Sequence, residues 1–384
     1  MKKTILFALA LFASLELFAT LPSAGSASFG VSQMQGGAPR SADSAPKPPQ
    51  SSVSQSVGLK SADSAKAGEV PVEHIAAPKT PSILQVEAEN YTQEQRKKIK
   101  EIERISQKAV KGDADAQNKM GDFYADNDLI PRDMRMAAYW WYEAASRKHP
   151  EALCRMGELY FSGTVMKKNT HRAVEYWKLS ALAGNAQAQY FLGSCYANGG
   201  QGVYLDYEQA AFWWQKSAAQ GNIRAMHNLA FCYARGQGVE KANSRMAYDL
   251  WRRAAEQGFV PAQTQLGLCY FSGEGVDKDL KLAANIWTAA TEKGDAEAQR
   301  LLGLCYYYGL GVDEDKNTAQ VLFEAAAYQG DADAKKLFEK VVLEIGLRKA
   351  DSPAPKVVPL VPGRRDTKNS ALFRTVRKDE VQLN

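Results

Sequence analysis

The sequence has little histidine, a nearly balanced charge and no long apolar run, and each shortage argues against a class of protein. Its four histidines show neither a His-Glu-x-x-His arrangement nor another zinc-ligand spacing. The net charge of +5 over 384 residues is slight, and the basic excess lies near the chain ends instead of along a helix. Beyond residue 27, no segment stays apolar for the roughly 20 residues that a bilayer-spanning helix needs. We therefore expect no metal or cofactor, no nucleic acid partner and no transmembrane segment in the mature chain.

Motifs for nucleophilic catalysis are also scarce. A Ser-x-x-Lys pair activates serine by placing an amine one helical turn away. The only match, Ser44-Ala-Pro-Lys47, lies in a segment without apolar periodicity. Asp122 and Glu158 stand one repeat apart, but that spacing alone does not indicate catalysis. We therefore expect a protein that is not an enzyme.

The two ends of the chain differ in composition from its middle. Lys2 and Lys3 precede an apolar run from Ile5 to Leu21 that is interrupted by Glu16 and followed by small residues. This pattern predicts a signal peptide over residues 1–27 and export to the periplasm or the medium. An uncleaved N-terminal anchor would share the basic and apolar flank and is the alternative.

Residues 28–86 and 348–384 have the composition of segments without a packed core. The first is rich in Ser, Ala, Gln, Gly and Pro, and the second is similar but more basic. Such segments bury too little apolar surface to offset the entropy of ordering, so we expect a disordered linker and a disordered basic tail. The tail is compatible with a weak contact with an anionic cell envelope.

The middle of the chain repeats with a period of 36 or 37 residues. One series consists of Trp141, Trp177, Trp214, Trp251 and Trp287, with Phe323 at the next place. A second series in the same register consists of Gly121, Gly157, Gly193, Gly267 and Gly303, with Ala230 filling the gap. Each member of the second series is followed three residues later by tyrosine. Two series in one register predict a repeat architecture of about six units, numbered here from the one with Trp141.

Each unit reads as a pair of helices. In the fifth, Ala262, Leu266 and Tyr270 lie four residues apart and so share one face of a first helix, where Gly267 lets another helix approach closely. The glycines of the turn Gly273–Val276 tolerate the positive φ of a helix end. The second helix carries Ala283, Trp287 and Ala290, and Gly294 closes the unit.

The same Gly-x-Gly-Val turn occurs at Gly236–Val239 and Gly309–Val312, and with one extra residue at Gly199–Val203. A glycine-rich loop can also bind nucleotide phosphates, but only after a strand and within a βαβ unit. The pattern offers neither, so the turn indicates a helix cap.

Units of the form Ala-x-x-x-Leu-Gly-x-x-Tyr, then Gly-x-Gly-Val, then Ala-x-x-x-Trp resemble Sel1-like repeats, which are related to tetratricopeptide repeats. The resemblance covers roughly Asp115 to Gly330. It implies an all-α fold, an α/α solenoid or superhelix with capping helices, over residues 87–347. The first copy diverges most: Asn127, Leu129 and Ile130 replace the glycine turn, and Lys148 replaces the closing glycine.

Both ends of the array need atypical helices to cover them. Thr92 to Gln95 has the form of a capping box before a polar helix that reaches Gly112. After the last unit a helical apolar face continues to about Leu347, with Ala332, Leu337, Val341, Val342 and Ile345.

The five cysteines are expected to be free thiols. Cys195, Cys232, Cys269 and Cys305 hold one position in successive units, farther apart than the roughly 4.4–6.8 Å between Cα atoms that a disulfide requires. Cysteine-rich Sel1 relatives pair two cysteines across one unit, but this sequence lacks the second cysteine in every unit. We therefore predict small buried apolar side chains, and a free thiol at Cys154 as well.

Variable positions on the first helices suggest a binding surface. The positions three before and one after the glycine site lie four residues apart and so form one stripe, which in tetratricopeptide-type arrays lines the concave face. We predict a groove for a peptide or helix of a protein partner. Its residues are Tyr190, Ser194, His227, Phe231, Thr264, Leu268, Arg300 and Leu304. The alternative is that these residues pack between neighbouring units.

Two other functions stay open. A peptidoglycan or carbohydrate binder would show exposed aromatic platforms, for which Tyr190 and Tyr307 are the candidates. The resemblance to cysteine-rich Sel1 proteins also implies a weak hydrolase of the β-lactamase kind as a further possibility.

Overall fold

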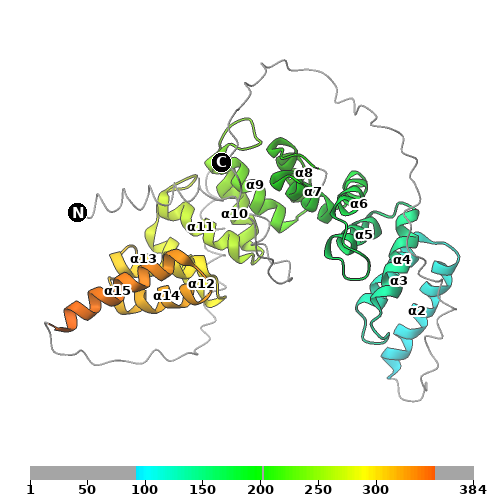
Figure 1. The fold of residues 1–384 in the computed structure, drawn as a ribbon, viewed down its shortest axis with the longest axis horizontal. Helices are drawn as coiled ribbons and strands as arrows, with labels where there is room; N and C mark the ends of the chain where they lie inside the picture. Colours follow the sequence, from blue (N-terminus) through cyan, green and yellow to red (C-terminus); the bar gives the residue numbers. More distant parts are fainter. Residues whose placement is uncertain (1–91, 201–202, 351–384) are drawn as a thin grey trace, which may run out of the picture. The chain divides into compact units, whose positions relative to one another are not determined.

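The computed structural model describes residues 92–200 and 203–350, with side chains up to residue 346. These ranges form fourteen consecutive α-helices and contain no β-strand, only an isolated bridge between Gly200 and Val203 (Figure 1). The predicted signal peptide, linker and nearly all of the predicted tail lie outside the described residues. None of the described helices is long and apolar enough to cross a membrane.

The described residues divide into two compact bodies, 92–152 and 153–350. The first holds α2 (Gln93–Val110), α3 (Ala114–Ala125) and α4 (Met134–Ser146). The boundary falls in the first turn of α5 (Pro150–Ser162), most of which belongs to the second body. The second body also holds α6 (Thr170–Leu182), α7 (Ala186–Asn198), α8 (Tyr207–Ala219), α9 (Ile223–Arg235) and α10 (Ser244–Glu256). It continues with α11 (Val260–Ser272), α12 (Leu280–Glu292), α13 (Ala296–Tyr308), α14 (Lys316–Tyr328) and α15 (Ala332–Ala350).

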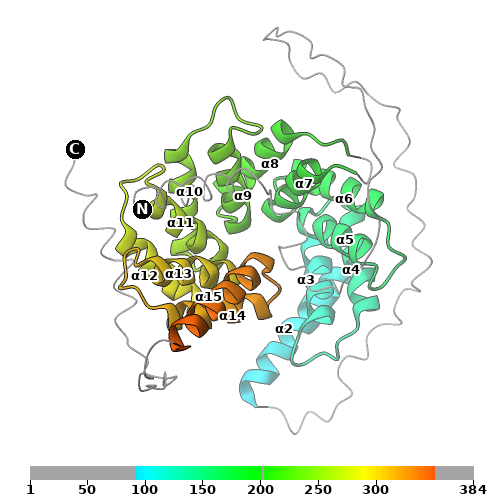
Figure 2. The same ribbon diagram turned by 60° about the vertical axis from the view of Figure 1, so that its left-hand side comes forward.

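Within each body, helices that follow one another in the sequence pack on one another, as α2 does on α3 in the first and α7 on α8 in the second (Figure 2). The units are the pairs α3–α4, α5–α6, α7–α8, α9–α10, α11–α12 and α13–α14. This confirms the all-α solenoid of about six units. The preceding α2 and the following α15 are the predicted capping helices.

Side-chain caps explain where the helices begin. Thr92 accepts a hydrogen bond from the backbone N–H of Gln95, whose own side chain accepts from the backbone N–H of Thr92, which confirms the predicted capping box. Most units start their first helix with Asn or Asp, as Asp295 does for α13. The exception in the later units is Phe259, which precedes α11 and makes no side-chain cap hydrogen bond.

Glycines explain where the first helices end. Gly236, Gly273 and Gly309 adopt the left-handed conformation at the ends of α9, α11 and α13. In each, the backbone N–H donates to the carbonyl of a cysteine four residues earlier. The turn is therefore a helix cap, as predicted.

The core of units one, two, three and five contains a contact between the glycine of the first helix and the tryptophan of the second. A Cβ atom placed on Gly267 would lie 2.4 Å from Nε1 of Trp287, and one on Gly193 would lie 2.7 Å from Cδ1 of Trp214. Trp287 and Trp214 are almost completely buried. The absence of a side chain at the glycine site is therefore what lets the indole reach the first helix.

Lys148 keeps the closing turn of the first unit in the geometry that glycine has elsewhere. Its φ is 61°, and it is the only described non-glycine residue with positive φ. The closing glycines Gly184, Gly221 and Gly258 have φ between 85° and 94°. In the turn that replaces Gly-x-Gly-Val, the Asn127 side chain accepts a hydrogen bond from the N–H of Leu129 at 2.8 Å.

A polar network ties α15 to the last unit. The Tyr307 hydroxyl donates to Oε1 of Glu344 at 2.5 Å, and Nζ of Lys316 lies 2.6 Å from Oε2 of the same carboxylate. These hydrogen bonds hold the pKa of Glu344 below its ordinary value. Beside the network, Val341 of α15 packs into the apolar cluster around Phe323. The cap is thus held by both apolar and ionic contacts.

The five cysteines are free thiols in the structure. Cys154, Cys232, Cys269 and Cys305 are buried, and Cys195 is half-buried. Burial raises the pKa of the Cys195, Cys232, Cys269 and Cys305 thiols to about 12. They therefore act as small core side chains and are poor nucleophiles.

Candidate interaction surface

The structure buries most of the predicted groove. Ser194 and Leu304 are half-buried, whereas the other six of the eight residues are at most 9% exposed. Those six are Tyr190, His227, Phe231, Thr264, Leu268 and Arg300. A side chain with so little exposed surface cannot anchor a partner, so the prediction of a docking groove is wrong for these six.

In units four to six, the position three residues before the glycine site packs against the residue that directly precedes the first helix of the next unit or, after unit six, α15. The hydroxyl of Thr264 donates to Oδ1 of Asp295 at 3.0 Å, and Nε of Arg300 donates to Oδ2 of Asp331 at 2.9 Å. At the equivalent place the His227 ring lies edge-on to Phe259, with centroids 5.3 Å apart. We call these three pairs the junction pairs. These contacts are the packing between neighbouring units that was the alternative to a docking groove.

The position one residue after the glycine site also contributes to the core. The ring of Phe231 lies edge-on to Trp251, with centroids 5.2 Å apart. Leu268 is buried and lines a small pocket together with Trp251 and Cys269. Leu304 packs against the apolar cluster of the last unit, and the Ser194 hydroxyl donates to the carbonyl of Tyr190 at 3.0 Å. The stripe is thus mainly structural.

The two candidate glycan platforms are buried as well. Tyr190 is 4% exposed and Tyr307 is 7% exposed. Neither ring can stack on a sugar in this packing. Among the described residues, no group of three His, Cys, Asp or Glu side chains is placed to hold a metal ion.

The turns between the two helices of units four, five and six form a row along one edge of the second body. A Cβ on Gly238 would lie 1.9 Å from the carbonyl oxygen of Tyr207 at the start of α8. Gly275 has the same relation to Ser244 of α10, and Gly311 to Leu280 of α12. Each of these turns therefore lies against the start of the second helix in the preceding unit. We call this row, together with the turns at the same place in units two and three, the turn edge.

One turn of the edge carries exposed apolar side chains. Tyr204 is 91% exposed and Leu205 is 57% exposed. They directly precede Asp206, the residue that caps α8. In the other turns of the second body the corresponding exposed pair is charged. Those pairs are Lys167 and Lys168, Glu240 and Lys241, Asp277 and Lys278, and Asp313 and Glu314.

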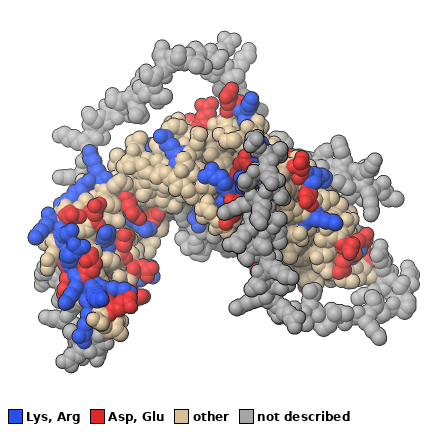
Figure 3. Space-filling model, turned by 180° about the vertical axis from the view of Figure 1, so that it is seen from behind, with Lys and Arg blue, Asp and Glu red and all other residues tan. Residues whose placement is uncertain are grey.

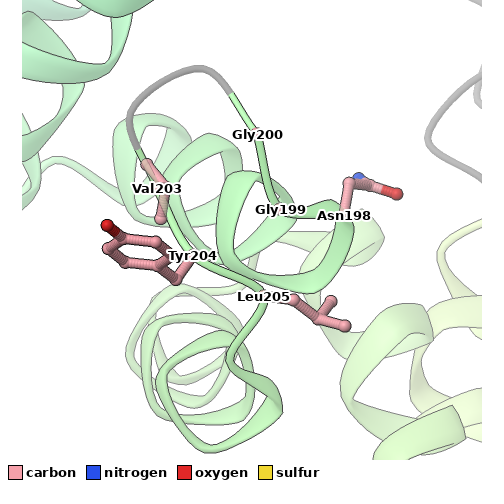
Figure 4. A pocket seen from close by; sticks show the side chains of 6 residues that line it. All are labelled: Asn198, Gly199, Gly200, Val203, Tyr204 and Leu205. Carbon is pink, nitrogen blue, oxygen red and sulfur yellow. The ribbon is translucent and has the colours of Figure 1, made fainter. Parts of the chain in front are cut away.

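An open pocket lies at the same turn. Its volume is about 480 Å³, and it is lined by Asn198, Gly199, Gly200, Val203, Tyr204 and Leu205 (Figure 4). Figure 4 shows the Tyr204 and Leu205 side chains on opposite sides of the turn. A segment that crosses the turn can therefore contact both.

The sequence contains a signal for this surface that helix periodicity does not reveal. Between the turn glycines and the cap of the second helix, units two, four, five and six each have two adjacent charged residues, whereas unit three has Tyr204 and Leu205. Aligning the turns by their glycines exposes this difference. Elsewhere, as Figure 3 shows, basic and acidic side chains are interspersed over the face in view.

The fold and the repeating contacts define a solenoid of helical pairs, and the family follows from the motif. The family model described as Sel1 repeat matches residues 114–149, 150–185, 186–222, 223–259, 260–295 and 296–331. The chain therefore belongs to the Sel1 repeat family.

Two solved structures share both fold and sequence with this chain. One, from uropathogenic Escherichia coli, is described as a protective antigen displaying an SLR fold; it is 32% identical over 66% of this chain, with a TM-score of 0.56. The other is a Sel1 repeat protein from Oxalobacter formigenes, 31% identical over 62% of this chain, with a TM-score of 0.50. The matches span 53% and 68% of those two proteins. No match was found among curated proteins.

Proposed function

We propose that this protein is a non-catalytic scaffold of the cell envelope or the secretome, and that it binds a protein partner through the turn edge around Tyr204. Sel1 repeats typically mediate protein–protein interaction, and the family is generally non-enzymatic. The proposal extends this to a particular surface. It replaces the buried stripe with the turn of unit three as the place of contact.

The observation that carries the proposal is the exposed apolar pair in one turn of five. The same position is occupied by charged side chains in the other turns of the second body, so the repeat does not require an apolar residue there. An exposed tyrosine and leucine cost solubility and contribute nothing to the core. Apolar side chains gathered at an exposed site typically mark an interaction surface, and tyrosine is among the residues enriched at binding hot spots.

Export from the cytoplasm is the second part of the proposal, and its support is the basic and apolar pattern of residues 1–27. Fractionation of cells that express the full chain tests it. Export predicts a shortened protein in the periplasm or medium, whereas retention of the full-length chain in the cytoplasm would reject export.

The binding site is tested by exchanging turn residues between units. Tyr204→Asp with Leu205→Lys gives unit three the charged pair of unit five and leaves the buried core untouched. Affinity capture from the source cells with the full chain should lose its partner with this double variant. Loss of an anchoring aromatic side chain costs about 2 kcal/mol or more of binding free energy.

The matched control makes a double substitution at the equivalent turn of unit five. Asp277→Ser with Lys278→Ser alters two exposed residues on the same edge and should leave capture unchanged. Circular dichroism confirms that both variants stay helical. If the folded unit-three variant captures the same proteins as the natural chain, the turn is not the binding site.

A further inference from the structure

The charge along the turn edge changes from basic to acidic, and the apolar turn lies next to its basic end. Unit two presents Lys167 and Lys168, whereas unit six presents Asp313 and Glu314, all of them exposed. Units four and five each present one acid and one lysine. Only the turn of unit three, between units two and four, presents an apolar pair.

The repeat geometry brings the basic turn close to Tyr204. In later units each turn lies against the start of the preceding second helix. The turns of units two and three lead into α6 and α8, which both pack on α7, so the stack sets the turn with Lys167 and Lys168 next to the turn with Tyr204. Helices in direct contact lie about 8–10 Å apart, so two turns separated by two such steps are at most about 20 Å apart, the length of about six residues of an extended chain. One short segment can therefore contact both turns.

We infer that the turn edge binds a protein segment in which acidic residues stand beside apolar ones. The acidic residues of the segment contact Lys167 and Lys168, and its apolar residues contact Tyr204 and Leu205. This inference rests on the proposed function and adds the chemistry of the partner. Complementary charge fixes the orientation of the segment, and the apolar turn provides the anchor. The pocket of about 480 Å³ beside Tyr204 has room for one large side chain.

The surface favours a peptide over a lipid bilayer. Lysines beside an exposed tyrosine and leucine also suit an anionic membrane. However, a flat bilayer that reached along this edge would meet Asp277, Asp313 and Glu314 as well, and these acids would repel it. The chain's own basic tail is disfavoured for the same kind of reason, since it would meet Lys167 and Lys168.

The test is selection from a random library of 12-residue displayed peptides on the immobilised full chain. The enriched peptides should carry acidic residues next to apolar ones. Lys167→Glu with Lys168→Glu should weaken the best of them about tenfold, because two exposed ion pairs become repulsive. Raising the salt from about 0.05 M to about 0.5 M should weaken them as well. The matched control, Lys241→Glu with Lys278→Glu on the later turns, should change little.

Three results would overturn the inference: no enriched peptide, enriched peptides without an excess of acids, or equal affinity after the reversal at Lys167 and Lys168. Binding to phosphatidylserine vesicles without any enriched peptide would show a membrane surface instead. Capture of the cellular partner separates the two proposals. If the change at Tyr204 and Leu205 abolishes capture and the reversal of the lysines does not, the proposed function stands and this inference fails. If neither change affects capture, both fail.

Discussion

The fourth and fifth units are built on the same plan but satisfy their buried polar groups in different ways. In unit five, Nε1 of Trp287 donates to the carbonyl of Thr264 at 3.0 Å, and the Thr264 hydroxyl donates to Asp295. In unit four, Nε1 of Trp251 and Nδ1 of His227 are buried and find no partner among the described residues. One unit is held by hydrogen bonds and the other by aromatic contacts.

The residue at the glycine site contributes to this difference. Unit four has Ala230 where unit five has Gly267, and a Cβ at the glycine site falls where the indole would lie. Glycine is necessary for the close approach but does not ensure the hydrogen bond, since Trp177 opposite Gly157 is also unpaired among the described residues. The comparison shows that the repeat can fold with the tryptophan N–H either hydrogen-bonded or unpaired, provided that aromatic rings fill the space around the indole.

The largest effect is expected from giving unit five the alanine of unit four. Gly267→Ala places a Cβ 2.4 Å from Nε1 of Trp287. The indole must move and lose its bond to Thr264, so the free energy of unfolding should fall by about 2–3 kcal/mol, even after the gain in helix propensity. Urea denaturation measures this. Gly346→Ala is the control: no neighbour lies within 4 Å there, so alanine should stabilise by up to about 1 kcal/mol. If Gly267→Ala lowers the free energy of unfolding by less than about 0.5 kcal/mol, the close contact with Trp287 is easily relieved.

Acid should weaken unit four more than unit five, because of these two units only unit four has a buried ionisable group, His227, in its junction pair. Burial lowers the pKa of His227 to about 3, against about 6.5 in the unfolded chain. A group whose folded pKa is depressed is protonated first in the unfolded state, so stability is lost as the pH falls below about 6.5. The loss attributable to His227 should be about 2 kcal/mol between about pH 6 and about pH 4.5.

Comparison with a His227→Leu variant isolates that loss from the titration of carboxylates. Urea denaturation at the two pH values gives the free energy of unfolding of each protein. The leucine variant should show the smaller decrease. Equal decreases in the two proteins would mean that His227 is accessible to protons in the folded state.

The smallest effect is expected from the reverse exchange. Ala230→Gly costs about 1 kcal/mol of stability through lower helix propensity. It also makes room for a hydrogen bond from Nε1 of Trp251, which contributes about as much stability. The net change in stability should be within about 0.5 kcal/mol. The indole N–H resonance of Trp251 in an NMR spectrum should move downfield if the bond forms. An unmoved resonance with a loss of about 1 kcal/mol would show that aromatic packing, not Ala230, sets the position of the ring.

Sequence periodicity predicts the helices, their glycine caps, the contact of Gly267 with a second helix and the burial of most cysteines, because these depend on local spacing. It fails for the stripe with His227 and Thr264. Spacing shows that two residues share a face, but it does not show which other segment covers that face. The partners Phe259 and Asp295 come 32 and 31 residues later and meet the stripe only when the units stack. The turn pair Tyr204 and Leu205 lies outside the helices, so periodicity says nothing about it.

The junction pairs have a consequence for how such a chain can change its length. Both members of each pair lie in one repeat: His227 and Phe259 in 223–259, Thr264 and Asp295 in 260–295, and Arg300 and Asp331 in 296–331. Recombination that removes or duplicates a whole repeat therefore carries a matched pair with it. After such an event a histidine at this position still lies beside a phenylalanine, and a threonine or an arginine there still lies beside an aspartate. The genetic repeat thus carries its junction pair complete, so the array can lengthen or shorten by one unit without a mismatch at that pair.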